Sequence, residues 1–255
     1  MSVFAGLRLA VGLLTIVPVR PPETIGRPQA RAAMLLAPVA VLPVTLVAAG
    51  LGWLVVWLGV PSPIAGVVVV AALAFGTRAM HLDGLADTTD GLGSGKDADA
   101  ALEIMRRGDI GPMGVVALVL VLGAQALAIG AVLGRPFGWV YLVVLVCASR
   151  GALALGCMRG IPAARPDGLG ALVADSVPLA TAATGWLVLA AATVWAGMLS
   201  GQTWWLPLVG VLLALAAVWW LLARCVARLG GVTGDVFGAL VEVAASVLLV
   251  VAAVG

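Results

Sequence analysis

Long apolar segments, separated by short polar ones, make up most of this 255-residue chain. A helix needs about 20 predominantly apolar residues to cross the hydrocarbon core of a bilayer, and seven segments come close to that length or exceed it. The pattern therefore predicts an all-α fold, a polytopic bundle of about seven transmembrane helices in a single domain, residues 1–255. The expected spans are 33–58, 62–82, 110–133, 136–157, 178–200, 204–224 and 236–254.

The N-terminal segment, Met1 to Val19, has a short apolar run with one arginine. It lacks the small-residue cleavage site of a signal peptide, and it leads into the sequence Val19-Arg20-Pro21-Pro22. We interpret it as a retained interfacial helix, which lies in the membrane surface or is partly inserted.

The composition requires lipid as the solvent for much of the chain. Apolar residues make up 63% of it and charged residues 10%, whereas soluble domains have about 25% charged residues. The formal net charge of +2 gives no reason to expect nucleic acid as a partner.

The charged residues gather on one side of the predicted membrane. Every lysine and arginine except Arg135 falls in the N-terminal segment or in the loops on that side. The positive-inside rule makes this side cytoplasmic. The acids lie on the same side, apart from Glu242, which is about two turns inside the seventh span. Because a transporter needs polar groups leading to both faces, the one-sidedness favours an enzyme whose active site faces the cytoplasm.

The segment from His81 to Gly95 is the richest in chemistry. Asp83, Asp87 and Asp90 have i, i+4, i+7 spacing, so their carboxylates share one face of a helix that continues out of the second span. Such close carboxylates repel one another unless a cation neutralises them, and oxygen-only ligands indicate Mg²⁺, with Mn²⁺ as a substitute. The alternative is a solvated helix end before a glycine-rich loop.

A second polar segment, residues 230–242, contains Asp235 and Glu242, which share a face of the last helix. An acid inside a span is a functional candidate because its burial costs several kcal/mol; the alternative is a structural ion pair with a nearby arginine, Arg224 or Arg228. The lone histidine, His81, is a candidate proton carrier or phosphate donor, or makes a helix-end hydrogen bond. Together with Asp90 of the first acidic segment, these residues make up the catalytic candidates, which are Asp90, Asp235, Glu242 and His81.

Several arginines lie on the cytoplasmic side or at its helix ends. Guanidinium groups bind phosphate through two parallel hydrogen bonds, although positive charge that sets the topology explains part of the set. The candidates for binding substrate phosphate are Arg106, Arg150, Arg159, Arg165 and Thr233.

A series of motifs in fixed order carries a resemblance to a known family. The series is His81 to Gly91, Leu102-Glu103-Ile104-Met105, Ile110-Gly111, Arg165-x-x-Gly168-Leu169-Gly170 and Gly231-x-Thr233-Gly234-Asp235-x-x-Gly238-Ala239-x-x-Glu242. Together these motifs resemble the cobalamin synthase family, the adenosylcobinamide-GDP ribazoletransferases of vitamin B12 assembly. This chain has Arg107-Gly108-Asp109 where the family often has Asp-Ser-Arg, so neither Arg107 nor Asp109 is assigned a role.

The resemblance implies an integral enzyme of the cell membrane that joins two small molecules. The 5′-hydroxyl of α-ribazole, or its 5′-phosphate analogue, would attack the cobinamide-proximal phosphorus of adenosylcobinamide-GDP. GMP leaves and adenosylcobalamin or its 5′-phosphate forms, with Mg²⁺ required. On this interpretation Asp83, Asp87 and Asp90 hold the metal, and Asp235 or Glu242 completes the site and takes the hydroxyl proton. Partners would be membrane lipid and a second copy of the chain or other late enzymes of the cobalamin pathway.

Two other functions remain open from the residues alone. The sequence Asp87-Thr88-Thr89-Asp90-Gly91 is similar to the start of the CDP-alcohol phosphotransferase motif, but the Ala-Arg that should follow is absent. A cation transporter with the acidic cluster as its mouth would require acids at mid-span or on the outer face, where the chain offers only Glu242.

Overall fold

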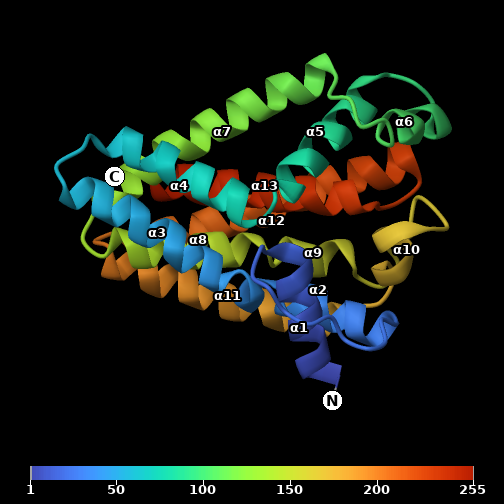
Figure 1. The fold of residues 1–255 in the computed structure, drawn as a ribbon, viewed down its shortest axis with the longest axis horizontal. Coiled ribbons are helices and arrows are strands. Elements are labelled where there is room, and N and C mark those ends of the chain that lie inside the picture. Colours follow the sequence, from blue (N-terminus) through green and yellow to red (C-terminus); the bar gives the residue numbers. More distant parts are fainter. Residues whose placement is uncertain (1, 255) are drawn as a thin grey trace.

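The computed structural model describes residues 2–254, and this part of the chain is helical without β-strands. Six helical segments are long and apolar enough to cross a membrane, and the long helices run along one axis of the molecule (Figure 1). The expected polytopic helical bundle is confirmed. The six segments are Arg27–Trp57, made of α2 (Arg27–Ala40) and α3 (Leu42–Trp57); α7 (Pro112–Leu133); Gly138–Gly156, made of α8 (Gly138–Ser149) and α9 (Ala152–Gly156); α11 (Leu179–Leu199); α12 (Trp205–Leu229); and α13 (Gly234–Ala252).

The expected second span is broken into two helices. α4 (Ser62–Gly76) and α5 (Met80–Gly93) meet at 91°, so the predicted helix that continues straight from the span through the aspartates is wrong. Arg78 and Ala79 turn the chain between them with φ of 56° and 52°, in the left-handed region. The Arg78 guanidinium donates to the carbonyls of Gly12 (2.6 Å) and Thr15 (2.8 Å), which stabilises this turn. Counted as one broken span, the pair raises the total to seven.

The N-terminal helix α1 (Ser2–Leu14) is fastened to this bend and to α2. It crosses the direction of the long helices (Figure 1), as a helix lying in a membrane surface would. Gly6 of α1 packs so closely on α2 that a Cβ at this position would lie 2.4 Å from the Cβ of Ala32. The backbone N–H of Ile16 donates to the carbonyl of Gly76 at the end of α4 (2.9 Å). The interfacial position remains a prediction.

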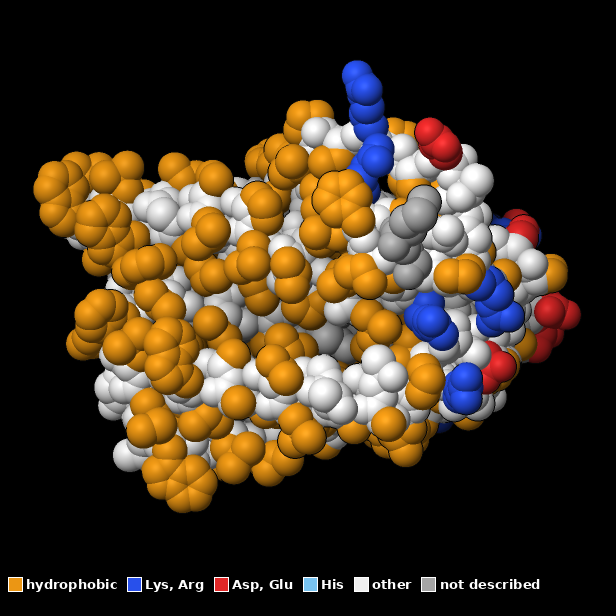
Figure 2. Space-filling model, turned by 90° about the horizontal axis from the view of Figure 1, so that it is seen from below, with side chains coloured by type: hydrophobic (Ala, Val, Ile, Leu, Met, Phe, Trp, Pro, Cys, Tyr) orange, Lys and Arg blue, Asp and Glu red, His pale blue; other side chains and the backbone are white. Residues whose placement is uncertain are grey.

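The surface of the bundle separates charged from apolar side chains. In Figure 2 the charged groups gather around one end, and apolar groups cover the rest of the visible face. That end carries two short helices, α6 (Ala98–Ile104) and α10 (Gly168–Val173) (Figure 1). Large apolar side chains stand well exposed elsewhere, including Phe75 at 80% and Trp220 at 70%. Together with the six apolar segments, this exposed surface favours lipid as the surroundings of the bundle.

Candidate active site at the charged end

Two motif segments that are far apart in the sequence pack face to face where α5 crosses α13. Gly84 of α5 contacts α13 directly, since a Cβ there would lie 2.5 Å from the carbonyl oxygen of Asp235. Gly238 of α13 contacts α5 in the same way, with a Cβ falling 3.0 Å from the carbonyl oxygen of His81. The two glycines thus let the helix backbones touch, which places the acids of α5 beside Asp235.

This crossing creates an acidic cluster, by which we mean Asp83, Asp87 and Asp235. Asp83 is exposed, and the other two are partly buried. Asp87 is close enough to Asp83, Asp235 and Asp90 for its carboxylate to be repelled by theirs, while Arg165 attracts it. A cation placed among these carboxylates would relieve both the repulsion and the cost of burial.

The acidic cluster offers the kind of carboxylates that a magnesium ion sharing its ligands with a substrate would need. Within residues 2–254, no three His, Cys, Asp or Glu side chains already form a metal-binding group. Magnesium usually keeps several waters and binds through one or two carboxylates together with substrate phosphates. Asp87 with one neighbour from the cluster would supply that number of carboxylates, and the metal itself stays a prediction.

Asp90 has a different immediate environment from the other two aspartates of α5. Its carboxylate is buried and accepts hydrogen bonds from the backbone N–H groups of Gly111 (2.7 Å) and Gly114 (2.9 Å). It therefore caps the first turn of α7 and fixes that helix to α5. Its assignment as a metal ligand or catalytic group stays a prediction.

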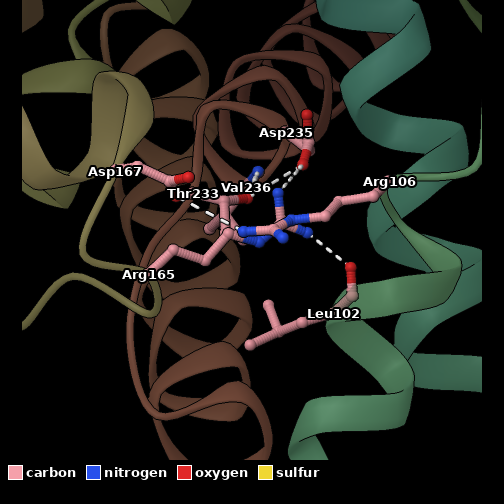
Figure 3. A network of polar contacts seen from close by, with 7 residues as sticks. All are labelled: Leu102, Arg106, Arg165, Asp167, Thr233, Asp235 and Val236. Atoms are coloured by element: carbon pink, nitrogen blue, oxygen red, sulfur yellow. Dashed lines mark hydrogen bonds and ion pairs between the residues drawn. The ribbon is translucent and has the colours of Figure 1, made fainter.

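A polar pocket of about 320 Å³ lies next to the acidic cluster. Arg165 lies at its wall, where its guanidinium donates to the carbonyl of Leu102 (2.6 Å) and lies 3.9 Å from the carboxylate of Asp235. Arg106 reaches the same pocket and pairs with Asp167 at 3.4 Å. Figure 3 shows both guanidinium groups directed into the space between α6 and the start of α13. The pocket therefore presents positive charge beside the carboxylates.

The N-terminus of α13 forms another wall of this pocket. The Thr233 hydroxyl accepts from the backbone N–H of Val236 (3.3 Å), which caps the helix, and donates to the carboxylate of Asp235 (3.1 Å). A helix N-terminus carries partial positive charge and unpaired N–H groups, so it favours an anion. The cap thus also fixes the orientation of Asp235.

The loop that carries Arg165 is attached to the segment before α13. The N–H of Ala164 donates to the carbonyl of Val232 (3.0 Å), and the N–H of Val232 donates to the carbonyl of Pro162 (2.9 Å). Gly231 makes this possible, because a Cβ at this position would lie 2.3 Å from the Pro162 oxygen. The sequence supplied the arginine and the glycine, but not their contact.

Besides Asp90, four of the predicted site residues lie outside both the pocket and the acidic cluster. Glu242 is buried inside the bundle, where it accepts a hydrogen bond from Gln125 (2.8 Å), and Arg150 is buried near it. His81 is buried without a hydrogen-bond partner for either ring nitrogen. Arg159 is exposed and does not line the pocket. Among the described residues, neither Arg224 nor Arg228 pairs with Glu242.

Gln125 is the residue that sequence reasoning missed. It is the one strongly polar side chain in the 22-residue helix α7, and that isolation within an apolar run was the available signal. Its amide also contacts the hydroxyl of Ser246 (3.1 Å), so it links α7 to α13 at two points.

The fold and site define a polytopic membrane protein with carboxylates and guanidinium groups at one end of the bundle. A family model described as cobalamin-5-phosphate synthase matches residues 6–253, and the chain belongs to this family. An adenosylcobinamide-GDP ribazoletransferase from Nocardioides sp. is 45% identical over 95% of each chain. Proteins of the same name from Frankia casuarinae and Bradyrhizobium diazoefficiens are 38% and 37% identical, covering 96% and 99% of this chain and 93% and 94% of their own. No solved structure matches the chain.

The resemblance carried by the motifs is therefore confirmed. It extends along nearly the whole chain, well beyond the motif-bearing segments. The interpretation as a cobalamin synthase accordingly replaces the two alternatives, the CDP-alcohol phosphotransferase and the cation transporter.

Proposed function

We propose that this chain joins adenosylcobinamide-GDP to α-ribazole or α-ribazole 5′-phosphate, giving adenosylcobalamin or its 5′-phosphate and GMP. The relatives that bear the name of this transferase align with the chain over nearly their whole length. The observation that carries the proposal is the contact of Gly84 with Asp235, which unites the two most specific motifs in one site.

One detail of the expected reaction changes when α-ribazole 5′-phosphate is the substrate. In making cobalamin 5-phosphate, the ribose of α-ribazole 5′-phosphate already carries a phosphate on its 5′ oxygen. The attacking group is therefore another ribose hydroxyl. Its oxygen forms a bond to the phosphorus next to cobinamide, the P–O bond to the GMP phosphate breaks, and the hydroxyl proton passes to a base.

The basic wall of the pocket suits a diphosphate. Arg106, Arg165 and the N-terminus of α13 all face it. They would hold the diphosphate and stabilise the charge that GMP gains on leaving, which is electrostatic stabilisation by groups already in place. Arg165 is held by Leu102 in the free enzyme, so little reorganisation is needed.

The acidic cluster would hold the magnesium ion, with Asp87 and either Asp83 or Asp235 as ligands; manganese would substitute. When bound, the ion neutralises the diphosphate and lets a hydroxyl approach. Asp235 is also the preferred acceptor of the hydroxyl proton over Glu242, because Asp235 lines the pocket and Glu242 does not.

We place the enzyme in the cell membrane with the charged end facing the cytoplasm. The basic residues around that end support this orientation through the positive-inside rule. The nucleotide substrate would then enter from the cytoplasm, while lipid surrounds the bundle. Association with a second copy or with other late pathway enzymes stays a prediction.

The test is turnover by an Asp87→Asn variant in phospholipid nanodiscs, measured as GMP released from adenosylcobinamide-GDP and α-ribazole 5′-phosphate with Mg²⁺. We expect the turnover of the variant to fall by about 100-fold or more, with an unchanged unfolding temperature. In the wild type, EDTA should abolish turnover, and added Mg²⁺ or Mn²⁺ should restore it. Asp99→Asn, an exposed acid on α6, is the matched control and should retain activity. Near-normal turnover by Asp87→Asn would discard the metal assignment. Turnover of CDP-diacylglycerol in place of adenosylcobinamide-GDP would discard the substrate.

A further inference from the structure

A small polar cavity lies inside the bundle, next to the bend between α4 and α5. Its volume is about 30 Å³, and five elements meet around it. The polar side chains on its wall come from the end of α4, from α7, from the end of α8 and from α13; they are Thr77, Gln125, Arg150 and Glu242. In a span, such a concentration of polar groups is costly unless each group is satisfied.

Arg150 is the group that the protein itself leaves incompletely satisfied. It is 4% exposed, and its Nη1 donates to the carbonyl of Val146 (3.1 Å) and to the hydroxyl of Ser149 (2.8 Å). Its Nε is buried without a hydrogen-bond partner. A buried N–H of a charged group without a partner is rare in proteins, so Nε is the group for which a partner has to be sought.

Glu242 lines the same cavity and would carry charge of the opposite sign. It is 7% exposed, and Gln125 donates to one of its oxygens. The charges of Glu242 and Arg150 interact, yet in the part of the chain that the structure describes no ion pair within 4.0 Å joins them. An arginine and a carboxylate that attract each other therefore line one cavity without a direct ion pair.

Water is the ligand that fits this cavity. A cavity needs about 10–15 Å³ to hold one water, which in turn needs two to four polar partners. Because the guanidinium and the carboxylate compensate each other, an ion of either sign would bring an unpaired charge into a site of low dielectric. Water brings none, and it can accept from the Nε of Arg150 while it donates to Glu242.

We propose that one or two ordered waters bridge Arg150 to Glu242, and that this hydrated ion pair positions α13 and the α4–α5 bend for the transferase reaction. Glu242 then acts as a positioning residue and does not touch substrate. Glu242 is seven positions along α13 from Asp235, about 10 Å at 1.5 Å per residue, whereas magnesium binds its ligands at about 2 Å. The bridge would act through α13, which carries Thr233 and Asp235 at its N-terminal end.

The first test is a high-resolution structure of the full chain in nanodiscs, and its result does not depend on activity. We expect density for one or two waters between the Nε of Arg150 and the carboxylate of Glu242. A dry cavity, a direct ion pair across it, or density for a bound ion would overturn the proposal.

The second test is a double-mutant cycle with Glu242→Gln, Arg150→Met and their combination. Each single variant leaves one buried charge uncompensated, so we expect its unfolding temperature to fall by about 6 °C or more and its kcat by about tenfold, with KM nearly unchanged. The double variant removes both charges and should recover most of the lost stability and kcat. Ser246→Ala, on the same face of α13, is the uncharged control and should stay within about twofold of the wild type.

The activity measurement depends on the proposed function, whereas the stability cycle does not. A double variant as inactive as Glu242→Gln, at restored stability, would show that Glu242 takes part in the chemistry and would overturn the positioning role. If the wild type itself releases no GMP while the stability cycle still shows coupling, the proposed function fails and the water bridge stands. Additive losses of stability in the double variant would refute the bridge.

Discussion

Replacing Gly84 by alanine tests the contact that builds the site. The new Cβ would lie 2.5 Å from the carbonyl oxygen of Asp235 and 3.0 Å from its Cα. Both atoms belong to the backbone, so no side chain can rotate away. Ordinary van der Waals contact begins at 3.4 Å, which means that α5 and α13 must separate by about 0.9 Å at this point.

A displacement of this size should affect catalysis more than stability. A reacting group misplaced by about 1 Å loses on the order of 100-fold in rate. The acids of α5 would move by that distance relative to Asp235, so we expect kcat to fall by about 100-fold. The loss of folding stability should be about 1–3 kcal/mol, the usual cost of overpacking, and part of it is offset by the better helix propensity of alanine.

The assay is GMP release by wild type and variant in nanodiscs, together with thermal unfolding of the same samples. Gly123→Ala is the matched control, since Gly123 also lies in a helix and a Cβ there would meet nothing within 4 Å. This control should keep full activity. A Gly84→Ala enzyme within twofold of the wild-type kcat would refute the idea that this close contact sets the site geometry.

Three further substitutions test single contacts. Asp90→Asn replaces one of the two oxygens that accept from α7 by a donor, so it should cost about 1–3 kcal/mol of folding stability. An unchanged unfolding temperature would contradict the capping of α7. Arg165→Lys removes the planar group that reaches both Leu102 and Asp235. We expect kcat/KM for adenosylcobinamide-GDP to fall about tenfold or more. Arg224→Lys, at an exposed position, is the control and should leave kcat/KM unchanged. Ala79→Gly relieves a residue with φ of 52° and should stabilise the protein by about 1 kcal/mol, and a lower unfolding temperature would argue against strain at the bend.

Apolar length and the one-sided charge could be read from the sequence, and the structure bears them out. A span must be apolar wherever lipid surrounds it, whatever its neighbours are, so six of the seven expected spans match helical segments to within a few residues. The first span begins earlier than expected, at Arg27. The acidic motif and the Gly-Asp motif were likewise visible, because they are local in the chain.

The second span shows where local pattern failed. Its apolar run continues into the aspartate helix, and the pattern contains no proline or glycine pair that would demand a break between Thr77 and Met80. The bend depends on Arg78, whose guanidinium binds carbonyls of the N-terminal segment more than sixty residues away. Such a partner cannot be inferred from the residues around the bend.

Tertiary structure also decided which predicted residues meet. Periodicity puts Asp83, Asp87 and Asp90 on one face of α5, but only packing turns Asp90 toward α7 and leaves Asp87 beside Asp235. Glu242 shares a face with Asp235 and nevertheless lies in a separate buried network with Gln125. The physical reason is that sequence fixes where a side chain points around its own helix axis, whereas the rotation and separation of that helix against its neighbours depend on all the surfaces that pack together.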